Sequence, residues 1–218
     1  MSVLPTLAET GIVAIVRGME PGTCLRLAEA YLAGGIRLVE VTFDQTGDSE
    51  KTLAAIAAIR REFSAEMCVG AGTVLTADQL KGVVDAGGEF MVTPNVNPAL
   101  IALAAKNGLA TMPGAFTPSE IVTAHEAGAD VVKVFPIRAL GSQYIRDVLA
   151  PLKHIKLMAV GGVTPDNAAE FLKAGCVGVG ASGALVNREW IAAGDWRRIE
   201  REARRFSRAV SSNFPLRP

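Results

Sequence analysis

The 218-residue chain has few of the side chains that bind metals or form disulfides. It contains two histidines, His125 and His154, and three widely spaced cysteines, Cys24, Cys68 and Cys176. A catalytic metal site draws on several His or carboxylate ligands, and both histidines fall in or after expected helices. An odd number of distant cysteines is typical of small core residues in a reducing compartment. We therefore expect no metal, no cofactor and a cytoplasmic location.

The chain also lacks net charge and long apolar segments. Lysine and arginine together number 22, as do aspartate and glutamate, so the formal net charge is zero. A neutral chain gives no electrostatic sign of binding to nucleic acid or to an anionic membrane. No apolar run reaches the roughly 18 to 20 residues that a membrane-spanning helix needs, and residues 1–5 lack a signal-type pattern. We expect neither nucleic acid nor a membrane among the partners.

What the sequence does contain is a repeated unit, a short apolar strand followed by an alanine-rich amphipathic helix. This alternation indicates a parallel sheet covered on both faces. Eight units in one chain favour a (β/α)8 TIM barrel of the α/β class over an open doubly wound sheet. We expect one domain over 1–218, a solvated arginine-rich helix at 196–206 and a frayed tail from about 211. The expected strands are 12–17, 38–43, 67–73, 90–93, 109–112, 131–135, 156–160 and 177–180, and the expected helices are 22–33, 49–61, 77–86, 98–106, 118–127, 142–149, 165–174 and from 183 onward.

One lysine lies in the middle of an apolar strand. Lys133 is flanked by Val132 and Val134, and it shares a strand face with Val131 and Phe135. Burial disfavours the charged amine, so its pKa should fall and the amine should become a nucleophile near neutral pH. The alternative is a lysine whose stem crosses apolar surface while its ammonium reaches solvent.

Two further charged residues lie on expected strands, Arg17 at the end of 12–17 and Glu40 within 38–43. In a barrel the carboxyl ends of the strands converge, so we expect three buried charges at one site. Lys133 would attack a ketone, Glu40 would move protons, and Arg17 would hold a substrate carboxylate. The alternative is an internal ion-pair network without turnover, which is the less favoured interpretation because buried charges contribute little to stability.

The last two strands end in glycine. Gly161 and Gly162 follow strand 156–160, and the segment 180–183 joins the last strand to an expected helix. Glycines let backbone N–H groups approach an anion, and a helix N-terminus adds a positive dipole end. Residues 178–183 also fit the dinucleotide pattern GxGxxG, but no second half of a dinucleotide fold can follow the last strand. The phosphate of a small-molecule substrate is the better interpretation.

Seven motifs in order resemble the bacterial KDPG/KHG aldolase family, whose substrates are 2-keto-3-deoxy-6-phosphogluconate and 4-hydroxy-2-oxoglutarate. They are GIVAIVR at 11–17, GGIRLVEVT at 34–42, VGAGTVL at 69–75, VTPN at 92–95, MPG at 112–114, VKVFP at 132–136 and AVGGVTP at 159–165, within a similarity over about residues 8–205. The resemblance implies a metal-independent Schiff-base lyase that releases pyruvate and glyceraldehyde 3-phosphate, and it implies a homotrimer. It places the Schiff-base lysine at Lys133, the acid–base glutamate at Glu40, the pyruvate pocket at Thr73, Pro94 and Phe135, and the phosphate loop at Gly161, Gly162 and Ser182.

The chain departs from the family pattern at two positions. Some members carry an arginine where this chain has Asp44, and in those members it holds the substrate carboxylate. In this chain Arg17 would bind that carboxylate instead. Many gluconate enzymes carry threonine where this chain has Val160, and residues 139–145 also resemble the galactonate branch. Both epimers, and the short substrate 4-hydroxy-2-oxoglutarate, therefore stay open. The rivals are another phosphate-binding barrel enzyme, such as an isomerase or a thiamine-phosphate-synthase-like transferase, and a non-catalytic phospho-sugar-binding protein.

Overall fold

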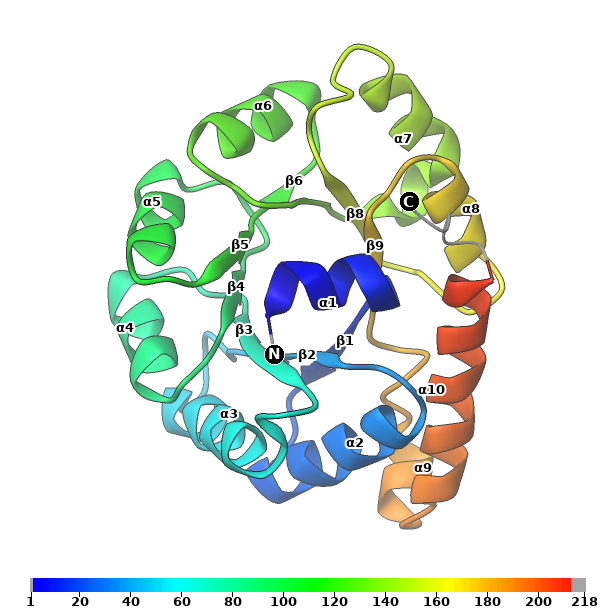
Figure 1. The fold of residues 1–218 in the computed structure, drawn as a ribbon. Coiled ribbons are helices and arrows are strands. Elements are labelled where there is room, and N and C mark those ends of the chain that lie inside the picture. The colour runs from blue at the N-terminus through cyan, green and yellow to red at the C-terminus, as the bar shows by residue number, and fades with distance from the viewer. Residues whose placement is uncertain (1, 213–218) are drawn as a thin grey trace.

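The strands form one parallel sheet that curves into a ring (Figure 1). The computed structural model describes residues 2–212. The order around the sheet is β5-β4-β3-β2-β1-β9-β8-β7-β6, with every pairing parallel. The strands are β1 (Ile12–Arg17), β2 (Leu38–Thr42), β3 (Cys68–Gly72), β4 (Phe90–Val92), β5 (Ala110–Met112), β6 (Gly114–Ala115), β7 (Val132–Val134), β8 (Leu157–Val160) and β9 (Gly178–Ala181).

A proline divides the fifth barrel strand into β5 and β6. Pro113 has no N–H and cannot donate to a ladder, so regular pairing is interrupted there. β5 pairs with β4 and β6 pairs with β7, which carries the sheet past the break. The Pro113 carbonyl still accepts from the Lys133 N–H at 2.8 Å. The predicted eight-stranded (β/α)8 barrel is therefore confirmed, and the alternative of an open doubly wound sheet is wrong.

Helices surround the ring and cover the outer faces of the strands (Figure 1). Thr117 and Glu120 form a capping box ahead of α6, and Asn97 caps α5 through the Leu100 N–H. The helices are α1 (Val3–Thr10), α2 (Pro21–Ala33), α3 (Ser49–Phe63), α4 (Ala77–Asp85), α5 (Pro98–Lys106), α6 (Pro118–Glu126), the 3-10 turn η1 (Ile137–Ala139), α7 (Gly141–Leu149), α8 (Ala168–Lys173), α9 (Arg188–Ala192) and α10 (Trp196–Ser211).

The structure adds one helix that was not predicted and corrects the start of two that were. α1 was not expected, because its eight residues carry only a short apolar pattern. The helix expected at 165 begins at Ala168, since Pro165 lies in a turn that Asn167 closes by accepting from the Thr164 N–H. No helix begins at 183: a single turn, in which the Val186 N–H donates to the Ser182 carbonyl, precedes α9.

α1 crosses the centre of the ring in Figure 1. It ends at Thr10 with Gly11 as its C-cap, immediately before β1, so it lies at the amino ends of the strands. Its Val3 and Leu7 are buried in the inner cluster of the barrel together with Val13 and Leu38. Burying one leucine contributes about 1.5–3 kcal/mol, which helps to hold α1 there. The barrel interior is therefore filled and capped at this end.

The remaining core lies between the strands and the outer helices. Cys24, Cys68 and Cys176 are buried and free, as predicted. α10 packs against α2, and two of its arginines form ion pairs, as between Arg204 and Glu200. Across residues 2–212 no helix has the length and apolarity to cross a membrane. Within the expected frayed tail Ser211 still belongs to α10, and 213–218 lie outside the described residues.

Candidate active site

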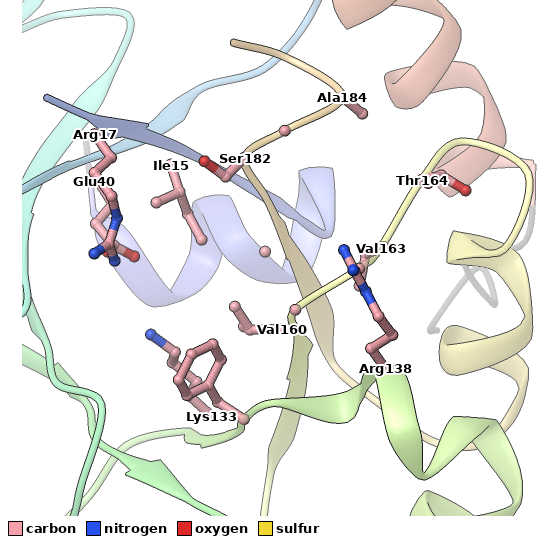
Figure 2. Close-up of a pocket in the computed structure, with 15 residues that line it drawn as sticks. Ile15, Arg17, Glu40, Lys133, Arg138, Val160, Val163, Thr164, Ser182 and Ala184 are labelled. Carbon is pink, nitrogen blue, oxygen red and sulfur yellow. The ribbon is translucent and has the colours of Figure 1, made fainter. Parts of the chain in front are cut away.

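A cavity of about 420 Å³ opens at the carboxyl ends of the strands (Figure 2). Its volume suits a small-molecule ligand. Eight of the ten site residues predicted from the sequence line it, and they come from β1, β2, β7, β8 and the segments that follow the strands. These eight are Arg17, Glu40, Lys133, Phe135, Val160, Gly161, Gly162 and Ser182.

Lys133 is held on β7 between β6 and β8, opposite Gly114 and Met158. Only 6% of its surface is exposed. Its Nζ lies 4.7 Å from the centroid of the Phe135 ring, within cation–π distance. Burial lowers the pKa of Lys133 below the ordinary lysine value, and the positive charge of Arg17 lowers it further, whereas Glu40 acts in the opposite direction. The amine is therefore suited to attack an electrophile.

Glu40 lies on β2 and is 1% exposed. Burial raises the pKa of Glu40, while the nearby charges of Lys133 and Arg17 lower it. Its Oε2 is buried and, within the described part of the chain, has no hydrogen-bond partner. A Cβ added at Gly72 would overlap this carboxylate, so glycine at that position makes room for it. A buried carboxyl group without an internal partner is available to a bound ligand.

The buried amine and the buried carboxylate do not form an ion pair. Within residues 2–212 every ion pair lies elsewhere, so the Lys133 Nζ and the Glu40 oxygens are more than 4.0 Å apart. Both side chains face the cavity and leave space between them. The alternative of a structural ion-pair network is disfavoured, because such a network would join these groups directly.

Arg17 lines the cavity but is not buried. The five preceding residues of β1 are buried, and Arg17 is exposed at the rim of the barrel. The expectation of three buried charges is therefore correct for Lys133 and Glu40 and wrong for Arg17. Asp44 is also exposed, and its carboxylate accepts from the N–H and the hydroxyl of Thr46. These hydrogen bonds lower the pKa of Asp44.

Two predicted residues, Thr73 and Pro94, do not line this cavity. Thr73 lies in a second hollow of about 590 Å³, which shares Arg17 and Ser182 with the first. Its φ of 56° is in the left-handed region, and its carbonyl accepts from Gln45 Nε2 at 2.8 Å. Pro94 lines neither hollow. A side chain at Gly114 would contact its backbone, so its immediate neighbour is β6.

The loop after β8 forms the other side of the cavity. Gly161 and Gly162 have φ values of 102° and 81°, which favour glycine. Ser182 follows β9 and also lines this side. The predicted helix dipole at 183 is wrong, because that position begins a single turn. This loop therefore offers an anion its glycine backbone and neighbouring side chains, and no helix N-terminus.

Arg138 is the main site residue that sequence reasoning missed. It lies on η1 and lines the cavity beside Gly162. A basic residue two positions after the VKVFP motif was the available signal, but no periodicity shows where a short turn directs its side chain. Ile15 and Thr164 were likewise missed. The described residues contain no cluster of metal-ligating side chains.

The chain is similar to known aldolases over most of its length. The model of the family "KDPG and KHG aldolase" matches residues 3–202. The 2-dehydro-3-deoxy-6-phosphogalactonate aldolase of Escherichia coli K12 is 37% identical over 175 residues, which cover 80% of this chain and 83% of that protein.

Solved structures agree with this similarity. A native KDPGal structure is 34% identical with a TM-score of 0.84, and the match covers 99% of this chain and 98% of the other. The KDPG aldolase of Legionella pneumophila, with pyruvate captured as a covalent carbinolamine, is 27% identical with a TM-score of 0.81. The match covers 91% of this chain and 95% of the other. The family match spans the strands that carry Lys133 and Glu40. The chain belongs to the KDPG and KHG aldolase family.

Proposed function

We propose that this protein is a class I aldolase that cleaves a 2-keto-3-deoxy-6-phospho sugar acid, of the gluconate or galactonate type, to pyruvate and D-glyceraldehyde 3-phosphate. The observation that carries the proposal is the pairing of a buried Lys133, whose pKa is lowered, with an unpartnered Glu40 across one cavity. A rival phosphate-binding enzyme or a binding protein has no use for such a lysine.

The residues supply each step of a retro-aldol reaction. The Lys133 amine attacks C2 of the substrate, and the resulting carbinolamine loses water to give an imine. Glu40 removes the proton of the C4 hydroxyl, the C3–C4 bond breaks, and its electron pair moves to C3 and the imine nitrogen as an enamine. The aldehyde leaves, C3 takes a proton, and water hydrolyses the imine to pyruvate. Arg17 binds the substrate carboxylate from the rim of the cavity.

The remaining predicted residues shape the binding of the substrate. Phe135 covers the Lys133 amine, and Gly161, Gly162 and Ser182 receive the phosphate. Thr73 and Pro94, expected in the pyruvate pocket, do not line the cavity: Thr73 lies in the adjoining hollow, and Pro94 lies beside Gly114. Val160 offers methyl groups rather than a hydroxyl to the C4 oxygen, so turnover of both epimers is compared in the assay.

Trapping with pyruvate and cyanoborohydride tests the proposal directly. We expect a stable adduct on the peptide that contains Lys133, located by peptide mass spectrometry. The trapping rate should rise with pH and reach a plateau below 10.5, the ordinary lysine pKa, because only the neutral amine attacks and burial lowers its pKa. Absence of an adduct on folded protein, an adduct confined to another lysine, or a rate that still rises through pH 10.5 would contradict the proposed site.

We further propose that the protein is a homotrimer, as the family resemblance implies. Three large apolar side chains of the described residues are exposed, Leu75 after β3, Leu103 on α5 and Phe116 after β6, and these elements follow one another around the barrel. A contiguous apolar patch is typical of a subunit interface, and we propose that these three side chains belong to one. Light scattering should give a mass three times that of the 22.8 kDa chain. A monomer mass at micromolar concentration would refute the trimer.

We also infer a cytoplasmic location. Three free cysteines, Cys24, Cys68 and Cys176, lie buried in the barrel. Burial raises the pKa of Cys24 and of Cys176 to about 12. Such thiols remain protonated and act as core residues, which suits a reducing compartment.

A further inference from the structure

Arg138 brings a third cation to the cavity, on the side of the glycine loop. It lies on η1, the single turn that follows β7. Its side chain runs directly over Gly162, because a Cβ built on that glycine would come within 2.6 Å of Arg138 Nε and 3.1 Å of its Cγ. Any other residue at 162 would displace the arginine. The backbone of the loop and the guanidinium are thus in direct contact.

The Arg138 guanidinium has no partner among residues 2–212. Arg138 is exposed, and across residues 2–212 its side chain takes part in no ion pair and no hydrogen bond. By contrast, Arg205 and Arg204 each pair with a carboxylate. Arginine presents five N–H donors in a planar fork that fits two oxygens of a phosphate. These donors are available to a ligand without the loss of any internal bond.

The distribution of charge around the cavity suits a ligand that is anionic at both ends. Arg17, Lys133 and Arg138 line it, against a single acid, Glu40, whose pKa is raised by burial. Figure 2 shows Arg17 and Arg138 on opposite sides, with Lys133 reaching in from a third. If Arg17 holds a carboxylate, Arg138 and the loop at Gly162 are left to bind an anion at the far end of the ligand.

We propose that Arg138 binds the terminal phosphate of the substrate and makes this enzyme selective for phosphorylated over unphosphorylated 2-keto-3-deoxy sugar acids. The inference rests on the proposed aldolase function and extends it to substrate choice. The reacting carbons lie at Lys133 and Glu40, whereas Arg138 lies beside Gly162. Its contribution is therefore to binding of the remote phosphate.

The test compares a phosphorylated sugar acid with the same carbon skeleton lacking phosphate. Pyruvate release is measured for wild type, Arg138→Gln and Arg138→Lys. The control is Arg61→Gln, since Arg61 is exposed on α3 and away from the cavity. We expect Arg138→Gln to lower kcat/KM for the phosphorylated substrate about 10- to 100-fold, which is the scale of a charged hydrogen bond. For the unphosphorylated substrate, kcat/KM should change less than about twofold. Arg138→Lys should recover part of the loss, and Arg61→Gln should match wild type.

A binding measurement separates this inference from the aldolase proposal. Titration calorimetry with glycerol 3-phosphate, which the enzyme cannot cleave, should show a dissociation constant about 10-fold or more higher for Arg138→Gln than for wild type. The role of Arg138 would be overturned if Arg138→Gln lowered kcat/KM equally for both sugar acids. It would also be overturned if the dissociation constant of glycerol 3-phosphate did not change. If wild type releases no pyruvate from either sugar acid, the aldolase proposal fails, and calorimetry still decides whether Arg138 binds phosphate.

Discussion

Lys133→Ala is expected to abolish pyruvate release, with kcat lowered by more than about 10⁴-fold. The cavity has no second amine that could replace it: among its lining residues the other cations are Arg17 and Arg138, and a guanidinium stays protonated. In the proposed mechanism, loss of Lys133 removes the covalent electron sink itself, so the remaining groups would bind the sugar acid without cleaving it. The rate of pyruvate release is measured in a coupled assay with lactate dehydrogenase.

Folding of this variant is checked with a second substitution. Lys133→Met keeps the length of the side chain against Phe135 and removes only the amine. Because the folded pKa of Lys133 is lowered, the unfolded chain binds more protons between that pKa and 10.5, and this lysine lowers the free energy of unfolding at neutral pH. Lys133→Met should therefore melt no lower than wild type. Appreciable turnover by either folded variant would exclude the imine route.

Glu40→Gln is expected to lower kcat by about 10²- to 10⁴-fold, the usual contribution of a positioned acid or base. The amide has nearly the same shape as the carboxyl group and fits the space beside Gly72, so KM should change little. Pyruvate should still be trapped on Lys133, but more slowly. The substitution also removes the charge that raises the pKa of Lys133, so the trapping plateau should move to lower pH.

Glu89→Gln is the matched control for this substitution. Burial raises the pKa of Glu89 too, but it contacts Arg60 and the Val69 N–H, away from the cavity. Its kcat should stay within about twofold of wild type. A Glu40→Gln enzyme that keeps more than a tenth of wild-type kcat would show that another group moves the proton.

The positions of Lys133 and Glu40 could be predicted because both lie within regular strands, where side chains alternate between faces. The position of Arg17 at the rim could not, because burial of the last strand residue depends on how far the strand extends beyond its neighbours. The direction of Arg138 depends on the turn η1, and the turn at 183 depends on local hydrogen bonds. Periodicity carries no information on either.

The cap that α1 forms over the amino end of the barrel bears on the fate of the covalent intermediate. With Val3 and Leu7 filling that end, the cavity opens at the carboxyl ends of the strands, and in the proposed mechanism the sugar acid and the water that hydrolyses the imine both enter from that side. A substrate that occupies the opening keeps bulk water from the imine, so carbon–carbon cleavage can precede hydrolysis. Departure of the aldehyde then admits water to the pyruvate that remains. In the proposed mechanism, entry from one side of the barrel therefore favours cleavage before hydrolysis, in addition to the reactivity of the groups inside the cavity.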